Sequence, residues 1–277
     1  MPSSKLLYRI FYSRKFKFIL PALIIALILL SIYIYNVYLS PRESIGYVEG
    51  EIVYLPLPRI RKDVLSVEEA LAYRRSIRDY RNESLTIEQL SQLLWAAYGI
   101  TEPRRGFKTS PSAGATYPLE IYVVIKSGGV RTENNTYLQP GVYHYDPYKH
   151  VLVLVKKGDF SRELMRASLD QEWVGSAPIN IVIAAVFERT TRYYGERGVR
   201  YVYMEVGHAG QNIYLEATAL GLGCVVVGAF YDEDVKEIVG LKDDEEPMYI
   251  IPVGVPKKSY RVSEEEIHQY ILRNRGG

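Results

Sequence analysis

The sequence has a single cysteine, Cys224, among 277 residues, so no disulfide can form within the chain. It has four histidines, and neither they nor Cys224 have the spacing of a zinc site. The net charge is only +2, from 34 basic and 32 acidic residues, which is far from the basic excess of nucleic-acid-binding proteins. The sequence therefore predicts no metal site and no nucleic-acid partner. Both Cys224 and His208 are expected to be buried structural residues.

Signatures of three common enzyme classes are also missing. The chain has no Gly-x-Ser-x-Gly elbow and no Gly-Lys-Ser/Thr loop, so neither an α/β-hydrolase nor a P-loop nucleotide triphosphatase is indicated. Gly221, Gly223 and Gly228 end a predicted helix and lead into a strand, which reverses the order of a dinucleotide-binding fingerprint. A Rossmann domain is therefore not expected.

Charge is absent from residues 18–39, a stretch of 22 residues. A helix that rises about 1.5 Å per residue over this length crosses a hydrocarbon core of about 30 Å. A buried core helix rarely lacks charge for so long, and the apolar region of a cleaved signal peptide is only about 7 to 15 residues. The sequence therefore predicts a retained transmembrane helix over residues 18–39.

Basic side chains precede this predicted span. Residues 1–17 contain Lys5, Arg9, Arg14, Lys15 and Lys17, so the positive-inside rule predicts a cytoplasmic amino terminus and a domain on the outer face. Sequons for N-glycosylation at Asn82 and Asn134 are compatible with that side. Residues 40–65 contain three prolines and mixed charges, and are expected to form a linker to a single domain over residues 66–277.

Helices and strands alternate irregularly along this domain. Capping boxes that begin at Ser66, Thr86 and Ser263 predict helices, and helical spacing predicts a long central helix over residues 203–220 and a shorter one over 232–239. Apolar and β-branched runs predict strands over residues 119–125, 151–155, 179–186, 224–227 and 248–253, the second closing a hairpin with residues 143–145. This order favours an α+β fold over regular βαβ units.

Two segments have the composition of a ligand site. Arg74, Arg75, Ser76 and Arg78 place guanidinium groups and a hydroxyl at the end of the first domain helix, which suits a phosphate. A solvated helix end with cations near its negative pole is the alternative. Residues 110–118 are small and precede a strand, so that backbone can approach a flat ligand, although an ordinary loop has the same composition.

Five segments together resemble the nitroreductase superfamily, and most closely its SagB-type dehydrogenase branch. They are residues 74–78, the Ser-Ala-Gly-Ala-Thr-Tyr-Pro segment at 112–118, Gly-His-Ala-Gly-Gln-Asn at 207–212, Gly-Leu-Gly at 221–223 and Pro-Val-Gly-Val-Pro at 252–256. The resemblance covers residues 66–273 in order. It implies an α+β fold with a mainly antiparallel sheet flanked by helices, and an intertwined homodimer that binds FMN at the subunit interface.

The resemblance also implies roles for individual residues. Residues expected to hold the FMN phosphate and ribityl chain are Arg74, Arg75, Ser76 and Arg78, completed by Lys258 and Arg261. Residues expected to reach the flavin from the partner subunit are Ser112, Ala113 and Gly114. Residues expected to pass close to the isoalloxazine ring are Val227, Gly228 and Ala229. Tyr194 is the expected catalytic residue.

Two positions depart from the family pattern. Classical nitroreductases often have a glutamate where this chain has Gly228, and SagB-type enzymes have a Lys-Tyr pair where this chain has Tyr193 and Tyr194. The sequence therefore predicts an FMN-dependent oxidoreductase that acts on a flat or conjugated small molecule or a peptide. Azoline oxidation in a modified peptide, with Tyr194 acting alone, and a non-catalytic membrane-anchored scaffold that binds flavin are the alternatives.

Overall fold

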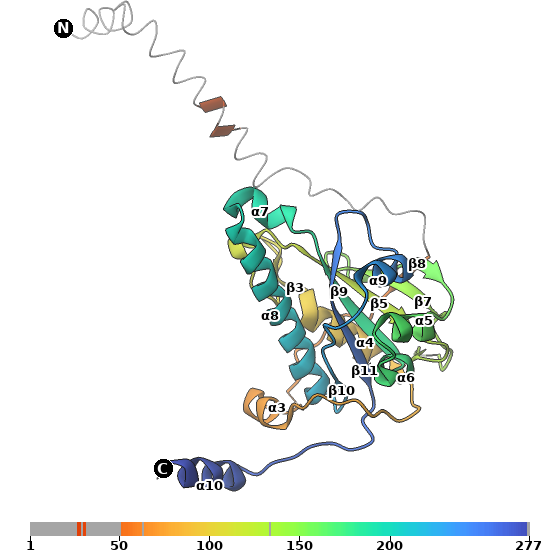
Figure 1. Cartoon of the computed structure of the whole chain (residues 1–277), viewed down its shortest axis with the longest axis vertical. Coiled ribbons are helices and arrows are strands. Elements are labelled where there is room, and N and C mark those ends of the chain that lie inside the picture. The colour runs from red at the N-terminus through yellow and green to blue at the C-terminus, as the bar shows by residue number, and fades with distance from the viewer. Residues whose placement is uncertain (1–26, 29, 32–50, 63, 133, 276–277) are drawn as a thin grey trace, which may run out of the picture. The chain divides into compact units, whose positions relative to one another are not determined.

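The computed structural model of the chain describes residues 27–28, 30–31, 51–62, 64–132 and 134–275 (Figure 1). The predicted basic segment 1–17 and almost all of the predicted span 18–39 lie outside the described residues. Within the described ranges, no helix has both the length and the hydropathy needed to cross a bilayer. The structure describes the domain that follows from Glu51 onward.

A seven-stranded sheet forms the centre of the domain, in the order β1-β8-β7-β5-β9-β11-β10 (Figure 1). Its strands are β1 (Ile52–Tyr54), β5 (Leu119–Ile125), β7 (Gly141–Asp146), β8 (Val151–Lys157), β9 (Ile179–Ala185), β10 (Gly223–Cys224) and β11 (Glu246–Gly254). All neighbouring strands are antiparallel. Two small pairings lie outside it, β2 (Leu85–Thr86) with β6 (Val130–Arg131) and β3 (Ile100–Glu102) with β4 (Phe107–Lys108).

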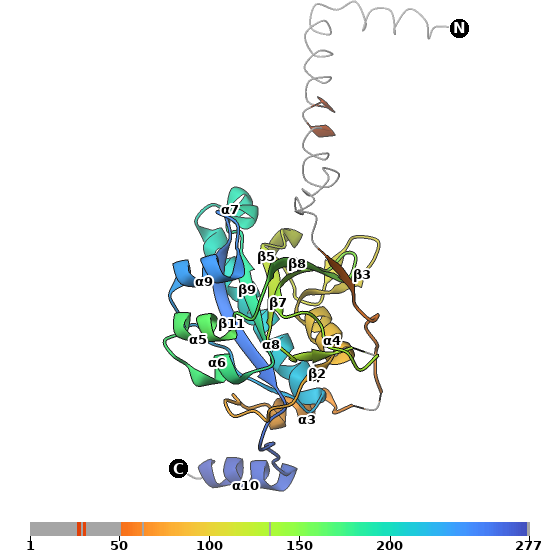
Figure 2. The same cartoon turned by 90° about the vertical axis from the view of Figure 1, so that its right-hand side faces the viewer.

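Helices cover both faces of the sheet, which explains why β5 and β9 are buried along their whole length and are mostly apolar (Figures 1 and 2). Side chains alternate between the faces, so that Ile121 packs with the core under α4 (Ile87–Tyr98) and α8 (Arg197–Ala219). Tyr122 packs on the opposite face, under α5 (Ser161–Ala167), α6 (Glu172–Ser176) and α9 (Asp232–Val239). The predicted α+β fold with an antiparallel sheet is therefore confirmed.

The predicted helix starts are confirmed by their caps. Ser66, Thr86 and Ser263 each accept a hydrogen bond from the backbone N–H three residues later, which satisfies a donor that the helix itself leaves open. The helices that they begin are α3 (Val67–Tyr73), α4 and α10 (Glu264–Asn274). The last of these lies apart from the sheet, and none of its residues is buried (Figure 2).

Several expectations need correction. The segment expected to be a linker contributes β1 to the sheet, where its residues pair with Val151, Leu152 and Val153 of β8. The central helix α8 begins at Arg197 rather than at residue 203, directly after the short helix α7 (Glu188–Tyr194). The strand expected over residues 224–227 is shorter, since β10 ends at Cys224 and only Val227 pairs again with Ile250 of β11.

The histidine on the long helix was also misassigned. His208 is exposed, because it follows Gly207 on the face of α8 that points away from the core, whereas Glu205 and Ala209 lie on the buried face. Cys224 is buried as expected, with an exposed fraction of 2%, and burial raises the pKa of its thiol well above the usual range. It is therefore a small core residue rather than a nucleophile.

Candidate functional site

Residues 74–78 run alongside β10, directly after α3. The N–H of Ile77 donates to the carbonyl of Cys224 over 2.9 Å. A Cβ atom at Gly223 would lie 2.8 Å from the Ile77 side chain, so glycine allows the two segments to approach this closely. The segment is therefore fixed by its backbone, and its polar side chains are free to face outward. Those that are exposed along it are Arg75, Ser76 and Arg78.

Each predicted phosphate-binding arginine lies over an aromatic ring. The guanidinium carbons of Arg74, Arg75, Arg78 and Arg261 lie 5.0, 3.6, 5.3 and 4.4 Å from the ring centres of Tyr214, Tyr260, Trp173 and Tyr73, respectively. Stacking of this kind holds a planar cation by its face and leaves its N–H groups at the edges. In Arg75, Nη1 donates to the carbonyls of Ala72 over 3.1 Å and of Arg74 over 2.6 Å. The arginines are thus oriented by the protein itself.

Tyr214 of α8 connects the arginine segment to the chain that follows β10. Its hydroxyl lies 3.0 Å from the Ser76 hydroxyl and accepts the N–H of Val226 over 2.9 Å. The next residue, Val227, exchanges backbone hydrogen bonds of 2.8 and 3.0 Å with Ile250 of β11. Gly228 and Ala229, which are expected to lie close to the flavin ring, follow Val227 directly. Both are exposed.

Gly228 lies open to solvent and has room for a side chain. A Cβ atom there would approach Tyr249 only to 3.8 Å, which is ordinary van der Waals contact. The backbone conformation at this position is one that any residue adopts. The absence of the glutamate of classical nitroreductases is therefore not imposed by the fold of this chain.

The segment after β11 returns to the arginines. The N–H of Lys257 donates to the carbonyl of Asp79 over 3.0 Å, and its ammonium lies 2.8 Å from the Asp79 carboxylate. Lys258, the next residue, and Arg261 are both exposed. Residues 74–78, 227–229 and 257–261 are therefore brought together within one protomer, and we call them the first half-site.

A second group of predicted residues lies around α7. Ser112 accepts the N–H of Tyr117 over 2.8 Å at the start of the short helix η2 (Ala113–Ala115). A Cβ atom at Gly114 would lie 2.6 Å from the Tyr194 hydroxyl oxygen, so this tyrosine packs directly on the glycine. The Tyr194 ring also makes an edge contact of 5.2 Å with Tyr201 of α8. Residues 112–114 and Tyr194 form what we call the second half-site.

The two half-sites lie toward opposite ends of α8 (Figure 1). The second half-site contacts α8 at Tyr201, and the first contacts it at Tyr214. At a helical rise of about 1.5 Å per residue, these two positions are about 20 Å apart along the axis. Within one protomer, Tyr194 and the arginine segment therefore contact α8 at well separated positions.

A buried ion cluster fixes α7 on the sheet. Arg189 of α7 pairs with Glu120 of β5 over 2.5 Å and donates to the carbonyl of Tyr117 over 3.2 Å. His144 of β7 lies 2.7 Å from the other Glu120 oxygen. Burial alone would raise the pKa of Glu120, but the hydrogen bonds and charges of His144 and Arg189 lower it to about 2. The carboxylate therefore stays ionised and holds the helix that ends at Tyr194.

Sequence reasoning missed a carboxyl group beneath the second half-site. Glu205 of α8 has an exposed fraction of 2% and accepts the Tyr98 hydroxyl hydrogen over 2.6 Å. Burial raises the pKa of Glu205 to about 7, against the lowering effect of Ser112, Tyr98 and Lys108. An acidic residue between Val202 and Val206 on the apolar face of a predicted helix was the available signal.

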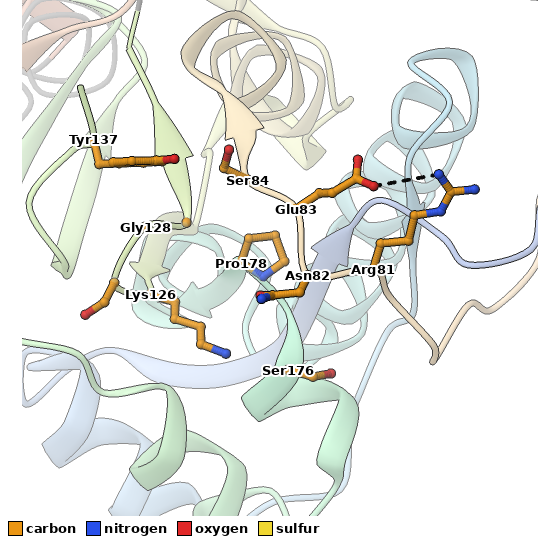
Figure 3. Close-up of a pocket in the computed structure, with 11 residues that line it drawn as sticks. Arg81, Asn82, Glu83, Ser84, Lys126, Gly128, Tyr137, Ser176 and Pro178 are labelled. Atoms are coloured by element: carbon orange, nitrogen blue, oxygen red, sulfur yellow. Dashed lines mark ion pairs between the residues drawn. The ribbon is translucent and has the colours of Figure 1, made fainter. Parts of the chain in front are cut away.

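A polar hollow of about 350 Å³ lies beside the first half-site, between the loop after Tyr80 and the ends of β5 and α6 (Figure 3). Its lining includes Asn82, Lys126 and Tyr137, and Arg81 pairs with Glu83 at its rim over 3.7 Å. None of the predicted flavin contacts lines it. Among the described residues there is also no group of His, Cys, Asp and Glu side chains that could hold a metal ion.

Comparison with known proteins agrees with the resemblance found in the sequence. The Nitroreductase family profile matches residues 71–255. MJ1384 of Methanocaldococcus jannaschii, a protein named for the nitroreductases, is 48% identical over 205 residues, which cover 74% of this chain and 98% of that protein. The microcin B17-processing protein McbC of Escherichia coli is 31% identical over 161 residues, 57% of each chain. A crystal structure named as a nitroreductase from Ralstonia eutropha is 28% identical with a TM-score of 0.63, and covers 75% of this chain and 90% of its own.

Proposed function

Since the chain belongs to the nitroreductase family and is related to its SagB-type members, we propose that it is an FMN-dependent oxidoreductase. It transfers hydride between the flavin and a flat or conjugated substrate. The observation that carries the proposal is the first half-site, where stacked arginines, an exposed backbone turn and the carboxyl-terminal segment meet. Bound FMN supplies the two-electron chemistry, and the chain binds, orients and shields it.

The donors of the first half-site fit the parts of FMN. Arg74, Arg75 and Arg78 would hold the phosphate, because guanidinium groups bind phosphate oxygens through paired N–H donors. Ser76 would bind the ribityl chain. Lys258 and Arg261 add positive charge from the segment after β11. The exposed backbone at Gly228 and Ala229, which follows the buried Val227, would face the ring, where amide groups tune the flavin without a side chain.

A homodimer supplies the rest of the site in this proposal. Tyr194, which packs on Gly114, contacts α8 at Tyr201, about 20 Å along the helix from Tyr214, where the arginine segment contacts it, so residues 112–114 would contact the flavin of the partner. Support comes from the side chains on the outer face of α8, where Tyr203 and Met204 are 54% and 52% exposed. The carboxyl-terminal helix α10 likewise exposes Tyr270, Ile271 and Leu272. Apolar surface of this extent is typical of a subunit interface.

Tyr194 is the residue that we expect to act on the substrate. Its side chain is 40% exposed and lies against Gly114, so its hydroxyl would be within reach of a molecule stacked on the partner's flavin. A tyrosine hydroxyl both donates and accepts a hydrogen bond, and as the phenolate it would accept the proton that leaves the substrate carbon and become the phenol. The exposed ring of Tyr193 would form part of the wall of the same pocket.

Peptide azoline oxidation is a second candidate, and the similarity to McbC favours it. That protein's name states that it processes microcin B17. The expected lysine of the Lys-Tyr pair is replaced here by Tyr193, so proton removal would depend on Tyr194 alone or with water. Turnover of a peptide that carries an azoline ring would distinguish this role from reduction of small conjugated molecules.

We also propose that residues 18–39 anchor the domain to a membrane. The support is the uncharged sequence of that segment and the basic residues before it. Extraction of membranes at alkaline pH tests it, since an integral anchor keeps the full chain in the pellet and releases a variant that lacks residues 1–40. Release of both proteins would contradict the proposal.

Purification of the full chain and identification of any chromophore that it releases on denaturation tests the main function. We expect a yellow protein that releases FMN and whose absorbance bleaches when a hydride donor reduces it. A folded protein that takes up no flavin would contradict the proposal. A protein that binds FMN but is reduced by no nicotinamide or substrate would favour the non-catalytic scaffold.

A further inference from the structure

Residues 228–230 form a turn that is fixed at both ends, and we call them the ring turn because they include two of the expected contacts to the flavin ring. Before the turn, Val227 exchanges two backbone hydrogen bonds with Ile250 of β11. After it, the N–H of Tyr231 donates to the carbonyl of Ala167, at the end of α5, over 2.8 Å. The ring turn is therefore attached both to the central sheet and to a helix that covers it.

The side chain of Gln171 holds the ring turn at a third point. Gln171 directly precedes α6, and its Nε2 donates to the carbonyl of Ala229 over 3.0 Å. The same nitrogen donates to the carbonyl of Ser168, at the end of α5, over 2.8 Å. Because the amide nitrogen has two hydrogens, both are used in these two bonds. Gln171 thus joins the end of α5 to the ring turn.

The corner between α5 and α6 has an unusual backbone. Leu169 and Asp170 have φ angles of 57° and 56°. Residues other than glycine rarely adopt such angles, which cost energy and persist only where the surroundings enforce them. Here Gln171 closes the corner on Ser168 through both its backbone N–H, over 3.3 Å, and its side chain. The strained corner directs the Gln171 amide to the carbonyl of Ala229.

Helix α6 also contacts the arginine segment of the first half-site. The guanidinium carbon of Arg78 lies 5.3 Å from the ring centre of Trp173, two residues after Gln171. Arg78 is an expected phosphate ligand and Ala229 an expected ring contact, so the start of α6 contacts both segments. Gln171 is therefore placed to act on the flavin site without belonging to either segment.

The planar peptide bond determines which way the amide groups of the ring turn point. In a trans peptide, the C=O of one residue and the N–H of the next point in opposite directions. The carbonyl of Val227 is bonded to β11, so the N–H of Gly228 points away from β11. The carbonyl of Ala229 is bonded to Gln171, so the N–H of Phe230 points away from Gln171. Among the described residues, none accepts a hydrogen bond from the N–H groups of the ring turn.

We propose that Gln171 is a positioning residue that directs the amide donors of the ring turn toward the flavin and thereby raises the reduction potential of the bound FMN. The proposal rests on the proposed function, since it takes FMN as the ligand of the first half-site. N–H groups that point at the ring stabilise the negative charge that the ring gains on reduction, so they bind reduced FMN more tightly than oxidised FMN. Gln171 acts through the carbonyl of Ala229, because both hydrogens of its amide are already used.

The test measures the FMN affinity and the flavin midpoint potential of Gln171→Met in the full chain. Methionine is similarly long and unbranched but has no N–H donor, so the carbonyl of Ala229 loses its partner. Loss of one hydrogen bond weakens binding about fivefold. We expect reduced FMN to lose about fivefold more affinity than oxidised FMN, which lowers the midpoint potential of a two-electron couple by about 20 mV.

Two further variants accompany Gln171→Met. Gln139→Met is the matched control, because Gln139 is exposed, precedes β7 and lies outside both half-sites. It should keep the affinity and the midpoint potential of the wild type. Gln171→Glu keeps the shape of the side chain but replaces the N–H donor with an oxygen that repels the carbonyl of Ala229. It should lower the midpoint potential at least as far as Gln171→Met.

Each outcome decides something different. If the Gln171 variants are folded and keep the wild-type midpoint potential, the proposal about Gln171 is overturned and the flavin function stands, even where FMN affinity falls. Loss of the fold in both variants would assign Gln171 to the stability of the corner between α5 and α6, and would also overturn the proposal. If the wild type takes up no FMN, the proposed function fails and this proposal fails with it.

Discussion

The hydroxyl of Tyr214 lies 3.0 Å from the hydroxyl of Ser76, a residue 138 positions earlier in the chain. The same oxygen accepts the N–H of Val226, and the Tyr214 ring lies under the guanidinium of Arg74. One side chain on the central helix thus holds together the two parts of the first half-site, the arginine segment and the turn toward residues 227–229. If this half-site binds FMN, Tyr214 sets its geometry.

Replacement of Tyr214 by phenylalanine should weaken FMN binding while the protein stays folded. The ring that stacks on Arg74 remains, but the Val226 N–H and the Ser76 hydroxyl lose their partner. Each lost hydrogen bond costs about 1 kcal/mol, so we expect affinity to fall about tenfold. Flavin fluorescence titration measures this. Tyr231→Phe, at a tyrosine that is 57% exposed and outside the half-sites, is the matched control and should bind like the wild type.

A charged side chain at Gly207 should break the dimer without harming the protomer. Gly207 is exposed on the outer face of α8, and a Cβ atom there meets nothing within 4 Å. Within the protomer, Gly207→Arg should stabilise α8 by roughly 0.5–1 kcal/mol, because glycine is a poor helix former. At a dimer interface, the same arginine would bury an unpaired charge.

Analytical ultracentrifugation measures whether Gly207→Arg loses the dimer. Thermal unfolding measures separately whether the protomer stays stable. We expect a monomer that has lost FMN, since its second half-site no longer meets a partner's first. A variant that remains dimeric and yellow would show that this face of α8 is not the interface. A dimer lost together with the fold would show instead that Gly207 is needed inside the protomer.

Acid should loosen the attachment of the segment that follows β1. The ring of His150 lies 2.8 Å from the Tyr145 hydroxyl through Nδ1, and 3.0 Å from the Pro56 carbonyl through Nε2. Burial lowers the pKa of His150 below its usual value of 6.5, although the Pro56 carbonyl acts in the opposite direction. Because the folded protein then binds fewer protons, this contribution to stability is complete above pH 6.5 and falls as the pH falls through that value.

His150→Asn should reduce this acid sensitivity, as measured by urea unfolding at about pH 7.5 and about pH 5. Asparagine tolerates the φ angle of 54° at this position better than other replacements. Glu205 contributes with the opposite sign, because its raised pKa gives stability that is lost as the pH rises. The comparison is therefore between wild type and variant at each pH, and an equal loss in both would contradict the role of His150.

The sequence predicted those parts of the fold that depend on local signals. Ser66, Thr86 and Ser263 were recognised because a capping box lies within four residues, and β5 and β9 because a strand covered on both faces is mostly apolar. Gly223 was placed correctly at the junction of α8 and β10. What required this glycine, the side chain of Ile77 against it, was not visible in the sequence.

The sequence did not predict contacts between polar atoms of residues that are far apart in the chain. Periodicity indicates that one face of α8 is buried, but it does not show that Glu205 meets Tyr98 or that Tyr214 meets Ser76. The sequence did not distinguish β1 from the expected linker, because a strand of three residues at the edge of a sheet has almost no pattern. His208 was misplaced because the small residues beside it, Gly207 and Ala209, do not show which side of the helix is buried at that point.

The central claim is that each flavin is held by the first half-site of one protomer and the second half-site of the other. Mixed dimers test it most directly. One protomer has Arg74, Arg75 and Arg78 changed to Ala. The other has Gly114→Val, which strains a residue with a φ angle of 59° and displaces the Tyr194 hydroxyl.

Each variant should bind no FMN as a homodimer, while keeping the melting behaviour of a folded domain. In a purified mixed dimer, one site combines both defects and the other combines two intact half-sites. The account predicts that mixed dimers recover half of the wild-type FMN content. Mixed dimers that recover none, although each variant is folded and dimeric, would show that the two half-sites do not form one site across the interface.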